Sequence, residues 1–578
     1  MNLYSEKRRN FFFIILLVLF ASLLTNNAFY GFGWTDEALY MATTNSLYRG
    51  SRLFFDIFEP TQIYSVLLLP LFYFFVKITG STDSIYLFMR IATIVLQLAA
   101  SILLYFMLSK KYKKAESFLA SCILLIFSRA QLFGPSYYTF VLINFTIANI
   151  LLFYVFNLNA KSAWLFVSGI FFGFAILCNP YLVLPYVIFS LCGVIFPSSR
   201  KNLKKYILLW IGTLFVGAIF LIFVFKNGSI KDFPSALTYF FSSPEYSSKT
   251  TLQKIKWLLK FPRLLVTQFV YFLPFSILAA ITFFKKNLKE KINRTAKTKT
   301  ILFLLLIINY IIEVFFTEKD NARPVTGFFA ASILVFILFS NKSINDYKKE
   351  ILFFLVPGLS LSFMECLASD TGFGVFSIGI VLCLPFAARL YFETFYSSAT
   401  SKTIKILSAV PVCLLILGTL YYRVNLTYRD ERIFPHYIFI PRLEKNIAKI
   451  DCGPAKGLWT HTENKSQYDS IYSAIKNIKS EKDDYFMVLK LCPWAYLVND
   501  NLKPFSMTAW RVSANDLRLK PYFEEFGHRF PEHILILNKN IRDNKNNEIE
   551  DSSYLIQELK NKNYKAKSTE CGILWEKI

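Results

Sequence analysis

The feature that most constrains the fold is a series of long apolar runs that begins at Phe11 and continues to about residue 422. A helix needs about 20 predominantly apolar residues to cross the hydrocarbon core of a bilayer. Hydrophobic residues make up 54% of the 578-residue sequence, and its mean hydropathy is +0.41. These values exclude an ordinary soluble domain and predict an all-α polytopic membrane protein.

Basic residues and run lengths predict how the chain threads the membrane. Lys7-Arg8-Arg9 precede the first run, which we interpret as a retained span with a cytoplasmic N-terminus, because no clear small-x-small cleavage site follows it. The run at 63–76 is only about 14 residues long and is broken by Pro70, so we expect an interfacial or re-entrant helix there. The other runs predict about thirteen spans, at residues 11–24, 85–108, 115–133, 138–156, 162–178, 181–196, 206–225, 264–284, 300–317, 325–340, 351–369, 374–391 and 404–422.

This topology places the basic loops together on the cytoplasmic side, as the positive-inside rule requires. An odd number of spans then puts the C-terminus outside, which predicts a multi-pass protein of the plasma membrane with an extracytoplasmic tail. The formal net charge is +25. We assign this charge to topology control and to anionic lipid headgroups, and we expect no nucleic-acid partner. The basic loops are 110–114, 200–205, 285–299, 342–349 and 402–405.

Two domains are predicted. Residues 1–423 form the transmembrane domain, with one outer loop at 29–84 and another at 226–263, and residues 424–578 form a small extracytoplasmic domain. Alternating strands and helices in this tail predict an α/β fold. The expected strands are 485–488 and 533–537, and the expected helices are 468–478 and 552–560.

A basic, helix-like piece closes the second outer loop, at residues 254–260. We expect Trp257 and Leu258 to lie on a different face from Lys256 and Lys260. Such a helix is typical of a segment that lies on the bilayer surface.

Charged residues gather at the outer face, where Asp36 and Glu37 directly follow the first span. A proton-coupled transporter would more naturally carry such groups near the midplane. The simplest alternative for Asp36-Glu37 is a solvated helix start, with Thr35 as N-cap and the two acids in the first turn. What favours a functional site is the whole order of features: span, Asp-Glu pair, short helix, turn, acid-Pro segment, interfacial helix and span.

That order resembles the GT-C superfamily of integral membrane glycosyltransferases, particularly the protein O-mannosyltransferase and aminoarabinose-transferase branch. The resemblance covers roughly residues 11–225. The second outer loop departs from the pattern because no Asp follows its Ser-Arg, and Asn179 stands where Lys is common. The matching motifs are Asp36-Glu37-Ala38-Leu39-Tyr40, Glu59-Pro60-Thr61-Gln62-Ile63-Tyr64, Thr79-Gly80-Ser81 with Phe88-Met89-Arg90, Phe127-Ser128-Arg129-Ala130, and Gly173-Phe174-Ala175-Ile176-Leu177-Cys178-Asn179-Pro180.

The resemblance implies transfer of a sugar from a polyprenyl-phosphate-linked donor to an acceptor hydroxyl on the extracytoplasmic face. An acceptor glycan, lipid or protein of the cell envelope and the surrounding membrane lipids are the implied partners. Asp36 is the expected base that takes the acceptor proton. Glu37 is expected to orient the acceptor or bind a cation. Gln62, Tyr64 and Arg129 are expected to contact substrate.

The departing lipid phosphate needs positive charge, from an Arg, a Lys or a divalent metal ion. Arg263 and Arg323 are candidates because both flank predicted outer span ends, and anchoring to headgroups is the alternative for each. Glu59 is either a metal ligand or simply the end of its loop. No cofactor is specified by the sequence, and a divalent metal ion stays open. Two other function classes also stay open: a lipid or polysaccharide transporter, and a non-catalytic membrane assembly protein.

Overall fold

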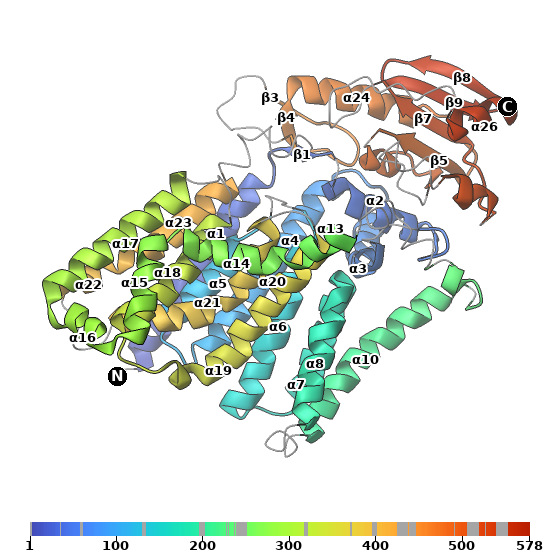
Figure 1. The fold of residues 1–578 in the computed structure, drawn as a ribbon. Helices are drawn as coiled ribbons and strands as arrows, with labels where there is room; N and C mark the ends of the chain where they lie inside the picture. Colours follow the sequence, from blue (N-terminus) through green and yellow to red (C-terminus); the bar gives the residue numbers. More distant parts are fainter. Residues whose placement is uncertain are drawn as a thin grey trace.

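The structure is a computed structural model. It describes residues 3–34, 36–57, 62–129, 134–195, 203–226, 228, 230–235, 237, 251–316, 322–369, 373–395, 402–424, 437–438, 447–490, 492–505, 519–525, 527–538 and 553–578. A helix bundle forms the larger part, and an α/β domain lies at one end of it, above α2 (Figure 1). The predicted fold class, a polytopic helical membrane protein with a small α/β domain, is confirmed.

The bundle helices follow the apolar runs. They are α1 (Leu3–Asn27), α2 (Asp36–Tyr48), α3 (Gln62–Thr79), α4 (Ile85–Leu108), α5 (Lys114–Ile126), α6 (Tyr137–Leu158), α7 (Ala163–Cys178), η2 (Pro180–Leu182), α8 (Val183–Ile195), α10 (Leu203–Phe225), α13 (Thr251–Leu258), α14 (Lys260–Val270), α15 (Leu273–Phe284), α16 (Lys286–Arg294), α17 (Ala296–Phe316), α18 (Arg323–Phe339), η3 (Ile344–Tyr347), α19 (Lys348–Glu350), the π-helical η4 (Ile351–Leu355), α20 (Val356–Ala368), α21 (Phe373–Phe395), α22 (Lys402–Leu407) and α23 (Ala409–Val424).

The count of about thirteen spans is not confirmed. Among the described residues, eight helices are long and apolar enough to cross a membrane. The pair α14–α15 would be a ninth, but it bends by 92° at its break. Three of the other predicted spans, at 162–178, 181–196 and 325–340, correspond to shorter apolar helices, Ala163–Cys178, Pro180–Cys192 and Arg323–Phe339. The expected interfacial helix at 63–76 is also a shorter apolar helix, Ile63–Thr79.

Two predicted segments differ in the structure. The expected break at Pro70 is wrong, because Pro70 lies inside α3, a helix of 18 residues that continues to Thr79. Whether α3 crosses the bilayer stays a prediction. The expected span at 115–133 ends early, because α5 stops at Ile126 and Phe127 has an extended backbone.

Side chains from two other helices explain the end of α5. The last carbonyls of a helix have no partner within it and need donors from elsewhere. Arg423 of α23 donates to the carbonyl of Phe127 at 2.7 Å, and Gln97 of α4 donates to the same carbonyl at 3.2 Å. These contacts fix where the chain leaves the helix, two residues before Arg129.

The predicted basic loops at 110–114, 285–299 and 342–349 lie together at one end of the bundle. Lys111 lies 3.6 Å from Glu350 and Asn293 donates to the carbonyl of Leu338 at 3.1 Å, so the three segments around 111, 293 and 345 are neighbours. The N-terminus, α16, α19 and α22 lie at the end of the bundle away from the α/β domain (Figure 1). The clustering agrees with the predicted grouping of basic loops, while the side of the membrane they face stays a prediction.

The C-terminal region contains a five-stranded sheet of order β6-β5-β7-β9-β8. The central pair β5–β7 is parallel, with Val488 opposite Leu535, and β7–β9 and β8–β9 are antiparallel. The strands and helices predicted in the tail are confirmed, with boundaries shifted by a few residues. The elements are β3 (Ile447–Lys449), β4 (Trp459–His461), α24 (Thr462–Lys476), β5 (Asp484–Leu489), η6 (Pro493–Leu497), β6 (Leu502–Pro504), β7 (His533–Leu537), α26 (Tyr554–Asn561), β8 (Tyr564–Thr569) and β9 (Gly572–Lys577).

The α/β domain packs directly on the first outer loop. Strand β1 (Phe32–Gly33) pairs with β2 (Tyr437–Ile438), and Asn45 of α2 donates to the carbonyl of Tyr496 at 2.9 Å. Trp34 meets Trp494 edge to face, with ring centroids 5.5 Å apart. One apolar core therefore contains residues of both parts. The boundary between 1–423 and 424–578 stays a prediction, but packing is continuous across it.

Candidate active site

A buried ion pair holds the Asp36-Glu37 segment in place. Both oxygens of the Glu37 carboxylate accept from Arg90 of α4, at 2.6 Å from Nε and 2.8 Å from Nη2. Arg90 also donates to the backbone carbonyls of Ala28 and Gly31, at 2.7 and 3.1 Å. Exposed fractions are 2% for Glu37 and 0% for Arg90. A bidentate pair between arginine and a carboxylate is among the strongest charge-assisted hydrogen bonds. Glu37 therefore anchors the start of α2 to α4.

Two glycines make room for the Glu37 carboxylate. A Cβ added at Gly33 would lie 2.6 Å from Oε2, and one added at Gly134 would lie 2.6 Å from Oε1. Glu37 was predicted to orient the acceptor or bind a cation. The structure places it instead against Arg90, with both of its oxygens engaged.

Asp36 lies beside this pair, as the first residue of α2, and is partly exposed. A helix N-terminus favours a carboxylate through its dipole. One turn further on is Tyr40, only 3% exposed. Burial, and then the negative charge of Asp36, raise the pKa of the Tyr40 phenol well above its usual value, while Arg129 lowers it and Glu365 raises it. The charges of Asp36, Arg129 and Glu365 therefore all act on Tyr40.

Arg129, which follows the end of α5, is another residue of the site. Its guanidinium lies over the ring of Tyr138, 4.1 Å from the centroid, and it is 6% exposed. Tyr40 meets Tyr64 edge to face at 5.7 Å and Tyr137 at 6.0 Å. Four tyrosines from α2, α3 and α6, namely Tyr40, Tyr64, Tyr137 and Tyr138, thus form one aromatic cluster, and the Arg129 guanidinium lies on it.

Glu365 and Asn179 are the residues that the sequence analysis did not assign to the site. Glu365 of α20 is 0% exposed, and its Oε1 accepts from Asn179 Nδ2 at 2.7 Å. The Asn179 side-chain oxygen in turn accepts from the backbone N–H of Tyr181 at 3.1 Å, where α7 gives way to η2. A signal was present in the sequence, since Glu365 is an acid inside an apolar run and Asn179 departs from the motif.

The other predicted site residues lie in different surroundings. Tyr64 is buried and belongs to the cluster of four tyrosines around Tyr40. Arg263 is exposed on α14. Arg323 is buried and lies 3.6 Å from Glu313, with a hydrogen bond of 3.2 Å to the hydroxyl of Tyr271. Glu59 and the side chain of Gln62 lie outside the described residues, although α3 begins at Gln62.

The face predicted for the basic surface helix needs correction. Trp257 and Lys260 were expected on different faces, yet both donate to the C-terminal end of α20. Trp257 Nε1 donates to the carbonyl of Cys366 at 2.8 Å, and Lys260 Nζ to that of Ser369 at 2.7 Å. The two side chains supply donors that the end of α20 lacks, and this need overrides the simple amphipathic pattern. They also fix the turn of α20 that carries Glu365.

The residues that could hold a metal ion are incompletely described. No group of three or more His, Cys, Asp or Glu side chains with metal-binding geometry occurs among the described residues. Glu59, which the sequence left open as either a metal ligand or the end of its loop, is outside them. Its role as a metal ligand therefore stays a prediction.

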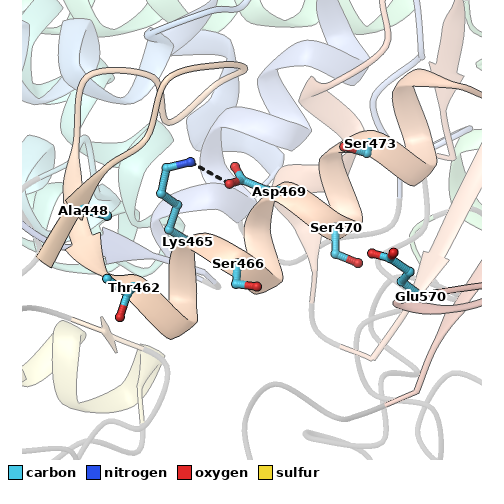
Figure 2. A pocket seen from close by; sticks show the side chains of 8 residues that line it. All are labelled: Ala448, Thr462, Lys465, Ser466, Asp469, Ser470, Ser473 and Glu570. Atoms are coloured by element: carbon cyan, nitrogen blue, oxygen red, sulfur yellow. Dashed lines mark hydrogen bonds and ion pairs between the residues drawn. The ribbon is translucent and has the colours of Figure 1, made fainter. Parts of the chain in front are cut away.

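A polar pocket of about 440 Å³ lies on the α/β domain, along α24 (Figure 2). Lys465 in this pocket forms an ion pair of 2.6 Å with Asp469. The opposite face of α24 carries Tyr468, which stacks on Trp494 at 4.4 Å. One helix therefore has its outer face in the pocket and its inner face against the core shared with the first outer loop. The pocket is lined by Ala448, Thr462, Lys465, Ser466, Asp469, Ser470, Ser473 and Glu570.

Fold and site together define a polytopic membrane protein with an acid–arginine–tyrosine site beneath an α/β domain. No family model and no curated protein matches the sequence. Solved structures similar to it include the oligosaccharyltransferase of Archaeoglobus fulgidus in the apo form, at 12% identity and TM-score 0.49, covering 91% of this chain and 69% of that one. The same enzyme in complex with Zn and sulfate aligns at 11% identity and TM-score 0.47, covering 98% and 73%.

ArnT from Cupriavidus metallidurans in the apo state is also similar, at 10% identity and TM-score 0.40, covering 98% of each chain. These neighbours are membrane glycosyltransferases of the GT-C superfamily, which the sequence motifs also resemble.

Proposed function

We propose that this chain is a glycosyltransferase that moves a hexosyl or pentosyl group from a polyprenyl-phosphate donor to an acceptor hydroxyl. The single observation that carries the proposal is the placement of Asp36. Its carboxylate is partly exposed at the start of a helix that the Glu37–Arg90 pair fixes, and it shares the surroundings of Tyr40 with Arg129. A base and a cation held close together on rigid elements are what transfer from a phosphate ester requires.

In the proposed reaction, the acceptor hydroxyl attacks the anomeric carbon of the donor sugar and loses its proton to Asp36. The bond between that carbon and the phosphate oxygen breaks, and the electron pair leaves with the polyprenyl phosphate. Arg129 is the best-placed cation for the leaving phosphate, because its guanidinium lies on the cluster of four tyrosines that includes Tyr40.

The remaining predicted residues receive supporting roles. Arg263, exposed on α14, is placed for contact with phosphate groups at the membrane surface. Arg323 is engaged by Glu313 and Tyr271, so we assign it to the packing of α17 and α18. We propose that the site faces the extracytoplasmic side of the plasma membrane, with a cell-envelope glycan, lipid or protein as acceptor and Glu59 as ligand of any divalent ion.

The test is Asp36→Asn in the full chain, assayed by sugar transfer from polyprenyl-linked donors in membranes. Loss of a general base predicts a fall of about 100-fold or more in transfer. Asp83→Asn is the matched control, because Asp83 is a partly exposed acid of the same outer loop, 3.8 Å from Lys456, and should keep near-normal activity. Wild-type transfer in Asp36→Asn would show that Asp36 is not the catalytic base. It would then favour the two other function classes, a transporter or a non-catalytic assembly protein.

A further inference from the structure

Glu365 contains a buried oxygen that is not satisfied within the described part of the chain. Oε1 is bonded to Asn179, but Oε2 is fully buried and has no hydrogen-bond partner among the described residues. A carboxyl oxygen in this state destabilises the fold unless another group donates to it. A position that costs stability and is nonetheless built on two helices suggests that the missing donor is supplied by a ligand.

A second unsatisfied group lies near Glu365. The hydroxyl of Tyr64 is also buried and without a partner among the described residues. Tyr64 lies on α3, which packs against α7, and α7 ends at Cys178, the neighbour of Asn179 in sequence. A hydrogen-bond acceptor, Glu365 Oε2, and a hydroxyl donor, that of Tyr64, are therefore both unsatisfied on helices that adjoin α7 and the turn after it.

We propose that Glu365, held by Asn179, is a substrate-binding carboxyl that accepts a hydrogen bond from a hydroxyl group of the saccharide. A hydroxyl is the group that matches the chemistry of each open position, because it can donate to a carboxyl oxygen such as Glu365 Oε2 and can accept from a phenol such as that of Tyr64. The hydroxyl belongs either to the donor sugar or to the acceptor. The proposal rests on the proposed glycosyl transfer, and Asp36 remains the base.

The decisive variant is Glu365→Met, which removes the unsatisfied oxygen and keeps an unbranched side chain of similar length. If Glu365 binds substrate, Met should raise KM for donor or acceptor by at least about 10-fold. The melting temperature should change by no more than about 3 °C, because removal of the unsatisfied Oε2 offsets loss of the bond from Asn179 to Oε1. Glu365→Gln should raise the same KM, because its amide still accepts from Asn179 but presents a donor in place of Oε2. A purely structural Glu365 would lose stability in both variants without a selective change in KM.

Glu350→Gln is the matched control, since Glu350 is also a buried acid but accepts from Tyr112 at 2.9 Å at the far end of the bundle. It should lower the melting temperature and leave both KM values unchanged. The full chain in lipid nanodiscs is assayed with a panel of undecaprenyl-phosphate hexoses and pentoses as donors. Sugar-free undecaprenyl phosphate serves as the second probe in a thermal-shift measurement.

The two sources of the hydroxyl give different results. If it belongs to the donor, the extra thermal shift given by sugar-linked over sugar-free lipid disappears in Glu365→Met and the donor KM rises. If it belongs to the acceptor, that extra shift stays and only the acceptor KM rises. Wild-type KM values for both substrates in Glu365→Met would overturn the inference alone. A wild-type protein with neither transfer nor a sugar-dependent shift would overturn the proposed function and this inference with it.

Discussion

Removal of either partner of the Glu37–Arg90 pair should strongly destabilise the first outer loop. Both side chains are almost fully buried, so a charge left alone there has no water to solvate it. In Arg90→Met, the Glu37 carboxylate loses both bonds, and the carbonyls of Ala28 and Gly31 lose their donor. Breaking a buried pair in this way costs about 3–5 kcal/mol.

The expected shift in melting temperature depends on how much of the chain unfolds with the loop. The loop shares one apolar core with the α/β domain, so we expect them to melt as one unit. For a unit of about 200 residues, each kcal/mol changes the melting temperature by roughly 2–4 °C, which predicts a fall of about 6–20 °C. Thermal unfolding of the purified full chain, followed by tryptophan fluorescence, measures this shift, since Trp34 and Trp494 both lie in that core.

Two comparisons separate the buried pair from general effects of substitution. Arg52→Gln breaks a second pair in the same loop, with Asp56, but Arg52 is 41% exposed, so its loss should cost no more than about 1 kcal/mol. The double variant Glu37→Met with Arg90→Met removes both charges and should be more stable than Arg90→Met alone. The reasoning fails if Arg90→Met melts within a degree or two of Arg52→Gln.

The remaining predictions concern acid stability and topology. Burial lowers the pKa of His528, which stacks on Tyr522 with ring centroids 4.0 Å apart. The unfolded chain therefore binds a proton at this histidine more readily than the folded chain does. The stability that the neutral ring gives above pH 6.5 is lost as the pH falls below 6.5. In His528→Gln, the melting temperature should fall less between pH 8 and 5 than it does in the wild-type protein. An equal fall in both proteins would show that other groups cause the loss of stability in acid. For topology, single cysteines at Ser109 and Ser470 in a background without the nine native cysteines should react with an impermeant maleimide from opposite sides of the membrane. Labelling of both from one side would contradict the predicted orientation.

The fold was largely predictable because its main elements depend on local patterns. Apolar runs gave the helices, and alternating apolar segments gave β5 and β7 within one or two residues. Asp36 could be singled out because it follows a span and opens a helix. The count of spans was less accurate, since the end of α5 depends on Arg423, far away in the sequence.

The partners of buried polar groups were not predictable from spacing. Arg90 is 53 residues from Glu37, and Asn179 is 186 residues from Glu365. Nothing in the periodicity of one helix indicates which distant side chain meets it, because the choice depends on how the helices pack. The same holds for Trp257 and Lys260, whose directions are set by the open carbonyls of α20.

The two carboxyls of the first outer loop illustrate how adjacent residues of similar chemistry divide into separate roles. Glu37 is fully engaged by Arg90, so it is a poor proton acceptor for substrate but a good fixed point for the helix that begins beside it. Asp36 is partly exposed on that fixed helix and keeps access to the tyrosines and Arg129. A base acts efficiently only when its position is held to a fraction of an ångström. The pairing of Glu37 thus provides the rigidity that the proposed chemistry of Asp36 requires.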